Sequence, residues 1–251
     1  MDEAYNKEQI ENDTEELEMS FLDHLEELRW RVIYSLIGVV VGSILCWIFI
    51  DFLVDQILLI PAKANKIKLQ NLKPFGQLFI YMQIAIIGGI VLSLPNLFYQ
   101  LWKFISPALR KNERRYISAI VWFSTLCFLI GIVFAYYLMI PLSLSFAAQF
   151  GSTSIENNFA IDEYFSIITS IMLAAGVVFE LPMVSFFLSK LGILTPKFMR
   201  RFRRHALVAI LVLSAILTPG TDPVSQVVLA VPLVLLYEIS IFVSKLSQKK
   251  T

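Results

Sequence analysis

The sequence predicts an all-α integral membrane protein with six transmembrane helices. Of its 251 residues 57% are apolar and 16% are charged, against about 45–50% and about 25% in soluble domains. The mean hydropathy is +0.70. The charges gather between apolar stretches that approach the roughly 20 residues a helix needs to cross a bilayer. This pattern excludes a soluble enzyme, a nucleic-acid-binding protein and a disordered scaffold.

Two charged tails flank the apolar region. Residues 1–19 carry eight acidic residues and one Lys, a composition that cannot bury a core and predicts a disordered acidic tail. It is also the opposite of a basic signal peptide or an Arg-rich transit peptide, so we expect no import leader. Residues 246–251 form a short basic tail. The region 20–245 between the tails is the predicted six-helix membrane domain.

Residues 21–29 predict a short amphipathic helix ahead of the first crossing, with Ser20 as its N-cap. The Phe and Leu residues share one face at about 100° per residue. Asp23, Glu27 and Arg31 form a polar stripe at intervals of four on the other face. We expect this helix to lie at the membrane interface.

Six apolar segments follow, and each is expected to cross the membrane as a helix. They span residues 32–50, 75–101, 116–140, 164–189, 206–217 and 224–243. Pro95 predicts a kink in the second segment, and the third is expected to end at Pro141.

The fifth segment is the shortest. Its twelve residues cover about 18 Å of a hydrocarbon core about 30 Å thick. A re-entrant loop would also fit, but Arg203, Arg204 and His205 can snorkel at its start, which favours a short crossing. Short fifth and sixth helices would thin the bilayer or leave a groove beside them. In the turn between them, Asp222 is the expected N-cap and Pro223 the first helical residue.

The distribution of Lys and Arg predicts that both termini face the cytoplasm or the stroma. The stretches before the first segment and after the second, fourth and sixth hold sixteen Lys and Arg, against four after the first. The first and last three segments show no visible repeat, which weakens the case for an inverted-repeat transporter.

The sequence predicts no cofactor, no metal site and no catalytic residue. Cys46 and Cys127 lie inside apolar runs, where small core residues are expected rather than a disulfide. His24 and His205 are far apart and belong to no metal-ligand motif, and no nucleotide-binding phosphate loop occurs. We therefore expect no enzyme activity, and an energy source outside the chain.

Two acidic residues near basic clusters are candidates for binding a cation. A structural interpretation gives Glu27 an i,i+4 ion pair with Arg31, worth a few tenths of a kcal/mol, and gives Glu113 a local charge-balancing role. In the functional interpretation, Glu27 and Glu113 converge as a receptor for a cationic ligand. Carboxylates bind guanidinium groups through paired hydrogen bonds, so the two acids suit arginines better than lysines.

Two further acids lie inside apolar segments. Glu180 stands two residues before Pro182, and a carboxylate there costs several kcal/mol unless it is protonated, paired or hydrated. A functional role is therefore favoured for Glu180. Glu238 lies nearer a membrane edge, a turn or two from Lys245, where a structural role is the stronger interpretation.

Four motifs resemble, in order, those of the TatC family, the core subunit of the twin-arginine protein translocase. They are FLDHLEELR at 21–29, PALRKNERR at 107–115, FELP at 179–182 and TPGTDPVSQ at 218–226. The resemblance runs from about residue 20 to residue 245. It implies a glove-shaped helical bundle that helps to move folded proteins with the proton-motive force and without nucleotide.

The resemblance also implies a signal-peptide site. Glu27 and Glu113 would bind the two arginines of a twin-arginine signal peptide on the cytoplasmic or stromal face. The residues that would shape or support this surface are Arg29, Phe104, Leu109 and Arg115.

Other residues would serve the assembled translocase. Glu180 would face the water-accessible concave side of the bundle. Thr218, Asp222 and Gln226 would lie where single-span TatA/TatB-type subunits dock in a multimeric complex.

The motif at 221–226 resembles cyanobacterial and plastid members of the family. Together with the expected lack of a transit peptide, it favours a plastid thylakoid membrane, with a bacterial plasma membrane as the alternative.

Two other functions are weighed. A proton-coupled small-molecule transporter would explain Glu180 and Glu238 but would need no single-span partners, and an intramembrane enzyme lacks a nucleophile and a base.

Overall fold

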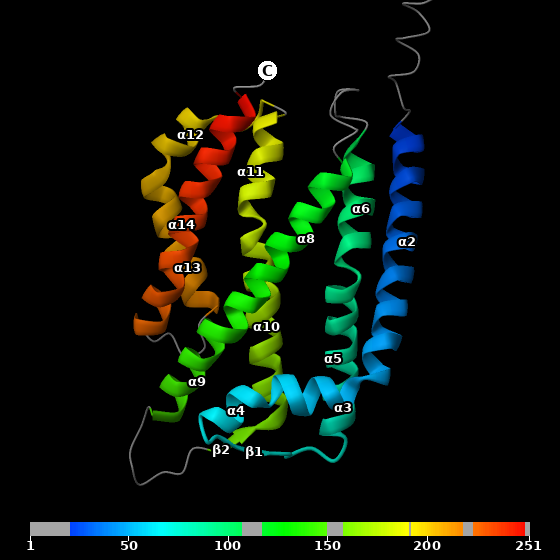
Figure 1. The fold of residues 1–251 in the computed structure, drawn as a ribbon, viewed down its shortest axis with the longest axis vertical. Coiled ribbons are helices and arrows are strands. Elements are labelled where there is room, and N and C mark those ends of the chain that lie inside the picture. Colours follow the sequence, from blue (N-terminus) through cyan, green and yellow to red (C-terminus); the bar gives the residue numbers. More distant parts are fainter. Residues whose placement is uncertain (1–20, 107–116, 150–157, 191, 218–222, 249–251) are drawn as a thin grey trace, which may run out of the picture.

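The computed structural model describes residues 21–106, 117–149, 158–190, 192–217 and 223–248. Within these ranges the chain is mostly helical, and the long helices run along the long axis of the molecule (Figure 1). Three helical stretches are long and apolar enough to cross a membrane, and a bent pair of helices is a fourth candidate. They are His24–Ile48, Ile117–Gln149, Ile161–Lys190 and the pair Gly76–Leu92 with Leu94–Ile105.

The first described helix, α2, runs unbroken over Phe21–Ile48. Residues 21–29 are therefore the first turns of the same helix as the first predicted crossing and not a short helix of their own, while their position at the membrane interface stays a prediction. No Gly or Pro stands between Arg29 and Val32, so nothing stops the amphipathic turns from continuing into the apolar ones. At 1.5 Å per residue α2 is about 42 Å long, which exceeds a hydrocarbon core of about 30 Å.

After α2 the chain runs across one end of the bundle (Figure 1). This crosspiece consists of α3 (Ile50–Leu53), the π-helical turn η1 (Val54–Leu58) and α4 (Ile60–Ala64). The buried hydroxyl of Tyr164 holds it: the hydroxyl donates to the carbonyl of Leu58 at 2.7 Å and accepts from the N–H of Ala62 at 3.2 Å. Strand β1 (Lys68–Gln70) pairs in parallel with β2 (Asn158–Ala160) at the same end.

The predicted kink at Pro95 is confirmed. Helices α5 (Gly76–Leu92) and α6 (Leu94–Ile105) meet at 55° across Ser93. Pro95 stands in the first turn of α6, where its missing N–H needs no helical partner. Helix α5 packs so closely on α2 that a Cβ atom added at Gly42 would lie 2.7 Å from the carbonyl oxygen of Gly89.

The third predicted segment extends past its expected end at Pro141, so that boundary is wrong. Helix α8 (Ile117–Phe134) continues through the π-helical turn η3 (Ala135–Met139) into α9 (Ile140–Gln149). A proline inside a regular helix clashes with the carbonyl four residues before it. That carbonyl, on Tyr137, lies within the wider π turn, which accommodates the proline ring.

The fourth segment is broken at Glu180. Helix α10 (Ile161–Phe179) ends there, and α11 (Leu181–Lys190) begins with Pro182 in its first turn. The carbonyl oxygen of Glu180 accepts from the N–H groups of Met183 and Val184, both at 2.9 Å. The break places Glu180 at the junction of α10 and α11, which together form one candidate span.

Three further helices complete the fold: α12 (Pro196–Arg201), α13 (Arg203–Leu217) and α14 (Pro223–Gln248). The 15 residues of α13 span about 22 Å, which confirms a short fifth helix. The expectation of a short sixth helix is wrong, because α14 has 26 residues and continues through the polar stretch after Val243. Pro223 is its first residue, as predicted.

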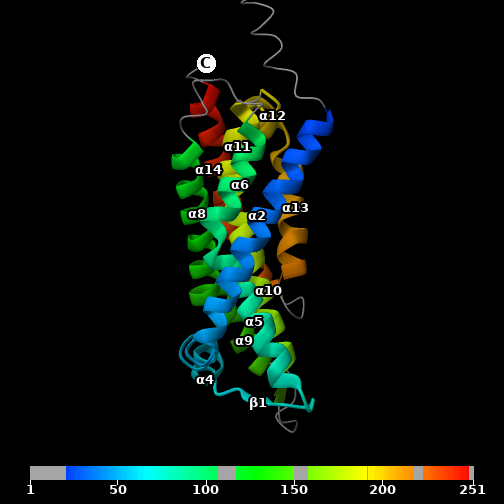
Figure 2. The same ribbon diagram turned by 90° about the vertical axis from the view of Figure 1, so that its right-hand side faces the viewer.

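The start of α2 and the end of α14 lie at the end of the molecule that holds α12, opposite the crosspiece (Figures 1 and 2). The largest core cluster of the described residues includes Val54 and Leu58 of the crosspiece and the fully buried side chains of Phe165 and Ile168 on α10. Cys46 belongs to this core, as predicted, while Cys127 is half-buried.

Candidate functional site

Contacts between α2 and α6 bring the predicted polar stripe of α2 to a defined surface. The ring of His24 stacks on Phe104, with centroids 4.4 Å apart and planes 19° from parallel. Two turns further along α2 and one turn along α6, Arg31 donates from Nη1 to Oε1 of Gln100 at 3.1 Å. A further turn along, Nδ2 of Asn96 donates to the backbone carbonyl of Tyr34 at 3.1 Å.

Glu27 lies at the centre of this surface. Its Oε1 atom accepts from Nη2 of Arg31 at 2.9 Å and from Nε at 3.3 Å. The predicted i,i+4 pair is therefore present. The Oε2 atom is buried and accepts no hydrogen bond from the part of the chain that the structure describes. A buried carboxylate oxygen without a donor costs free energy, so Oε2 is the atom most in need of a ligand.

The other predicted members of this site fall into two groups. Arg29 is exposed on α2, two residues and about 200° around the helix from Glu27. Phe104 is half-buried against His24. Glu113, Leu109 and Arg115 lie outside the described residues. The convergence of Glu27 with Glu113 therefore stays a prediction.

Glu180 is the least satisfied acid inside a candidate span. Its Oε1 atom is buried without a hydrogen-bond partner in the described chain. The carboxyl group faces α8, where the hydroxyl of Ser124 and the thiol of Cys127 are close enough to interact with it. The contacts described for Glu180 come from these neutral groups, and its protonation or contact with water stays a prediction.

Glu238 has a structural partner, but not the expected one. Its Oε2 atom accepts from Nη2 of Arg203 on α13 at 2.6 Å, in place of a pairing with Lys245. The side chain is exposed, so this pair contributes little stability. Gln226 ties α14 to α13 through a bond from Nε2 to the carbonyl of Leu211 at 3.0 Å. Thr218 and Asp222 lie outside the described residues.

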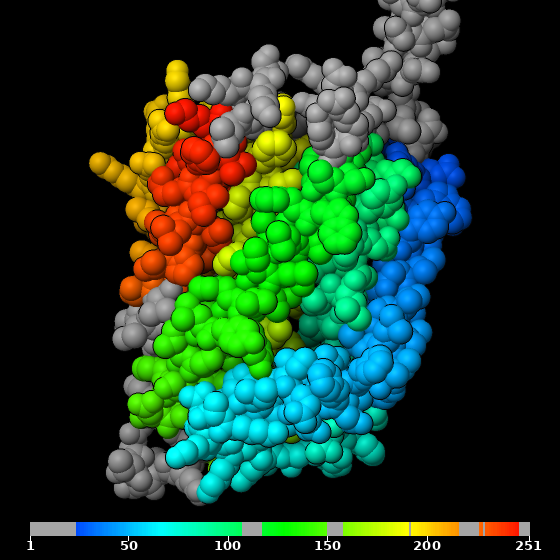
Figure 3. All heavy atoms as spheres, in the orientation of Figure 1, coloured from blue at the N-terminus to red at the C-terminus, as the bar shows by residue number. Residues whose placement is uncertain are grey.

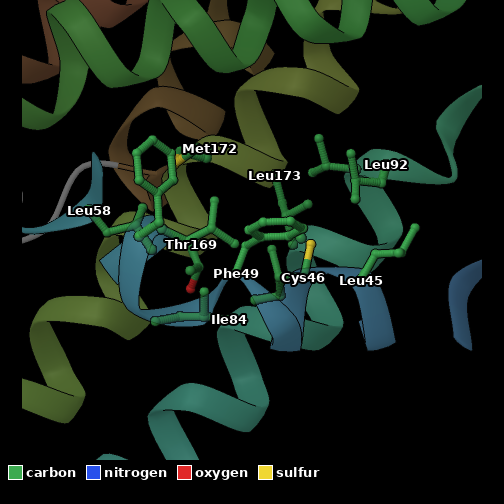
Figure 4. Close-up of a pocket in the computed structure, with 14 residues that line it drawn as sticks. Leu45, Cys46, Phe49, Leu58, Ile84, Leu92, Thr169, Met172 and Leu173 are labelled. Carbon is green, nitrogen blue, oxygen red and sulfur yellow. The ribbon is translucent and has the colours of Figure 1, made fainter. Parts of the chain in front are cut away.

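An apolar pocket of about 580 Å³ lies among α2, α3, α5 and α10 (Figure 4). The molecular surface is hollowed near the junction of α3, α5 and α8 (Figure 3). Thr169 and Cys46 are the lining residues with a hydroxyl or a thiol, and Thr169 already donates to the carbonyl of Phe165 at 2.7 Å. The lining holds no carboxylate, imidazole or amine and a single thiol, so it offers no acid–base pair and no cluster of metal ligands.

Sequence reasoning missed three residues of the α2–α6 surface: Asn96, Gln100 and His24. A signal for two of them was available. Asn96, Gln100 and Phe104 recur at intervals of four within or beside an otherwise apolar segment, which places them on one helix face. A polar face in a membrane-crossing helix indicates a buried partner or a functional surface.

Comparison with known proteins decides the family. Residues 23–232 match the model of the family described as Sec-independent protein translocase protein (TatC). The chain belongs to the TatC family. The TatC protein of Carboxydothermus hydrogenoformans is 37% identical to it, over 94% of this chain and 97% of that protein. The TatC protein of Synechocystis is 38% identical, over 86% of this chain and 84% of that protein.

A solved structure agrees with this assignment. A crystal structure described as that of the twin arginine translocase receptor TatC matches with a TM-score of 0.77 and 37% identity, over 90% of this chain and 99% of that one. Membership in a protein-translocase family confirms that the chain is not an enzyme. It does not favour the small-molecule transporter.

The relatives also bear on the membrane in which the protein resides. TatC proteins of bacteria such as Aquifex aeolicus, which is 37% identical over 92% of this chain, dominate the matches. The expectation of a plastid thylakoid membrane finds no support among them, and a bacterial plasma membrane fits them better. The motif at 221–226 is too short to outweigh similarity along the whole chain.

Proposed function

We propose that this chain is the receptor and core scaffold subunit of a twin-arginine protein translocase in a bacterial plasma membrane. It binds the twin-arginine signal peptides of folded precursors on the cytoplasmic face. With single-span TatA/TatB-type subunits, in a multimeric complex, it supports transport driven by the proton-motive force. The observation that carries the proposal is the buried, donorless Oε2 atom of Glu27 on the α2–α6 surface.

The proposed topology has six crossings, with the acidic tail and the basic tail both cytoplasmic. The shared end of Phe21 and Gln248 supports it, since an even number of crossings returns the chain to its starting side (Figure 1). Helix α12 at that end carries Lys197, Arg200 and Arg201, in keeping with the excess of positive charge on cytoplasmic loops. The crosspiece and the β1–β2 pair then lie on the outer side.

Recognition of the arginine pair follows from the chemistry of the acceptors. A guanidinium group presents fixed, planar N–H donors, whereas an ammonium group is a compact charge that holds its water more strongly. Oε2 of Glu27 accepts from one guanidinium. We propose that Glu113 accepts from the second, and that Arg29, Phe104, Leu109 and Arg115 shape the surface around them.

Two further roles belong to the proposal. Protonation of Glu180 couples the proton-motive force to transport; normal transport by Glu180→Gln under a full proton gradient would exclude this role. Thr218, Asp222 and Gln226 contribute to the surface on which the single-span subunits dock.

The test is site-specific photocross-linking of a twin-arginine precursor to the membrane-embedded protein, with a lysine–lysine precursor as the specificity control. Glu27→Gln and Glu113→Gln remove one charge each at nearly constant shape. Glu26→Gln is the matched control, because Glu26 is the exposed neighbour of Glu27 on the same helix. Loss of a charge-assisted hydrogen bond should weaken binding about tenfold to hundredfold.

The proposal predicts a cross-link that requires the arginine pair, persists in Glu26→Gln and falls in the other two variants. A cross-link that is equal for both precursors, or indifferent to Glu27 and Glu113, would contradict it. In that case uptake of a small solute by the purified chain alone becomes the next measurement.

A further inference from the structure

The ion pair of Glu27 uses only half of the carboxylate. Arg31 directs both Nε and Nη2 at Oε1, at 3.3 and 2.9 Å, and makes no bond to Oε2. An arginine and a carboxylate that meet without constraint commonly form two parallel bonds, one to each oxygen. In the part of the chain that the structure describes, Oε2 accepts no hydrogen bond.

Arg31 is prevented from rotating into the parallel arrangement because its third guanidinium nitrogen, Nη1, is also engaged. Nη1 donates to Oε1 of Gln100 at 3.1 Å, and Gln100 is only 9% exposed. Nε2 of Gln100 lies 3.4 Å from Oδ1 of Asn96, which is anchored to the backbone of Tyr34. A chain of hydrogen bonds therefore runs from α6 through Gln100 and Arg31 to Glu27.

We propose that Arg31 and Gln100 are positioning residues that orient the Glu27 carboxylate for a guanidinium ligand and so set its preference for arginine over lysine. This inference rests on the proposed function. The Glu27–Arg31 pair carries no net charge, so it attracts a passing cation only weakly. Recognition depends on directional bonds to Oε2, which a planar guanidinium makes better than an ammonium.

The test compares dissociation constants of a twin-arginine signal peptide and its lysine–lysine counterpart for the full-length protein in lipid nanodiscs. Arg31→Gln and Gln100→Leu release the Glu27 side chain, which must then be ordered on binding. This should raise the dissociation constant of the twin-arginine peptide about threefold to tenfold and lower its affinity advantage over the lysine–lysine peptide by the same factor. Arg31→Lys, which keeps the charge but not the forked donors, should rescue binding only in part.

A matched control and a double variant separate positioning from general structural damage. Lys103→Gln removes an exposed cation from α6 without touching Glu27, and should leave both constants unchanged. In a Glu27→Gln background Arg31→Gln should have no further effect, because it acts through Glu27. A variant that merely misfolds would lower binding in both backgrounds and would shift the unfolding midpoint.

Three outcomes would overturn the inference. Tighter binding of the twin-arginine peptide to Arg31→Gln would make Arg31 a competitor of the ligand. An unchanged preference for arginine over lysine in the Arg31 and Gln100 variants would show that these residues do not set it. If Arg31→Gln weakened binding equally in the Glu27→Gln background, Arg31 would act through a group other than Glu27. If wild-type protein does not distinguish the peptides, the proposed function itself fails; if it does, and Glu27→Gln abolishes the difference, only this inference is at stake.

Discussion

The close approach of α2 and α5 makes Gly42→Ala a sensitive perturbation. The added methyl group would lie 2.7 Å from the carbonyl oxygen of Gly89 and 3.1 Å from its Cα atom, whereas ordinary contact begins near 3.4 Å. Both neighbours are backbone atoms and cannot rotate away. The two helices must therefore part by about 0.7 Å, the difference between 2.7 and 3.4 Å, and overpacking of this kind costs about 1–3 kcal/mol.

Equilibrium unfolding of the purified protein in mixed micelles, followed by circular dichroism, measures this cost. Val40→Leu is the matched control, because it also adds one carbon to α2 but at a side chain that is 57% exposed. We expect the free energy of unfolding of Val40→Leu to stay within about 0.5 kcal/mol of that of the wild type. Equal stability of Gly42→Ala and Val40→Leu would refute the packing argument.

Three other predictions concern the remaining contacts. Tyr164→Phe removes a buried hydroxyl that serves two backbone groups of the crosspiece, so the free energy of unfolding should fall by about 1–3 kcal/mol in the same assay. A double-mutant cycle of Arg203→Gln and Glu238→Gln should give a coupling below about 1 kcal/mol that vanishes in high salt, since the pair is exposed; a salt-independent coupling would contradict this. The hydrogen bond between Lys73 and Asp162 raises the pKa of Lys73 above its usual 10.5 and lowers the pKa of Asp162 below its usual 3.8. The stability from this pair is therefore fully present between pH 3.8 and pH 10.5, and it is lost as the pH rises through the raised pKa of Lys73 or falls through the lowered pKa of Asp162. The distance between spin labels on β1 and β2 should accordingly stay constant from neutral pH up to pH 10.5. An increase in this distance between pH 7 and 10 would contradict a stabilising Lys73–Asp162 pair.

Hydropathy and proline positions predict much of the helical layout, but the effect of a proline depends on its surroundings. Pro95 and Pro141 carry the same local signal. One marks a 55° bend, whereas the other follows a π turn that lets the helix continue. A π turn is stabilised by packing rather than by its own residues, so the sequence alone does not distinguish the two cases.

The site shows the same division between local and distant information. The Glu27–Arg31 pair follows from a spacing of four on one helix, and the sequence predicts it. The contact of Arg31 with Gln100 joins residues 69 positions apart and depends on how α6 leaves the bend. Glu180 and Glu238 are both lone acids in apolar segments, yet among the described residues an arginine pairs with Glu238, from α13, and none with Glu180. Which acid stays unpaired is a property of helix packing and not of either segment.

The bend between α5 and α6 connects the packing of the bundle to the chemistry of the site. Below the bend, α5 approaches α2 closely because both helices carry glycine at the contact. Above it, α6 presents Asn96, Gln100 and Phe104 at intervals of four, and these meet α2 at Tyr34, Arg31 and His24 in turn. Such a series requires the two helices to run alongside each other for at least two turns. The orientation of the Glu27 carboxylate is therefore set by the direction of α6, and through it by the 55° bend before Pro95.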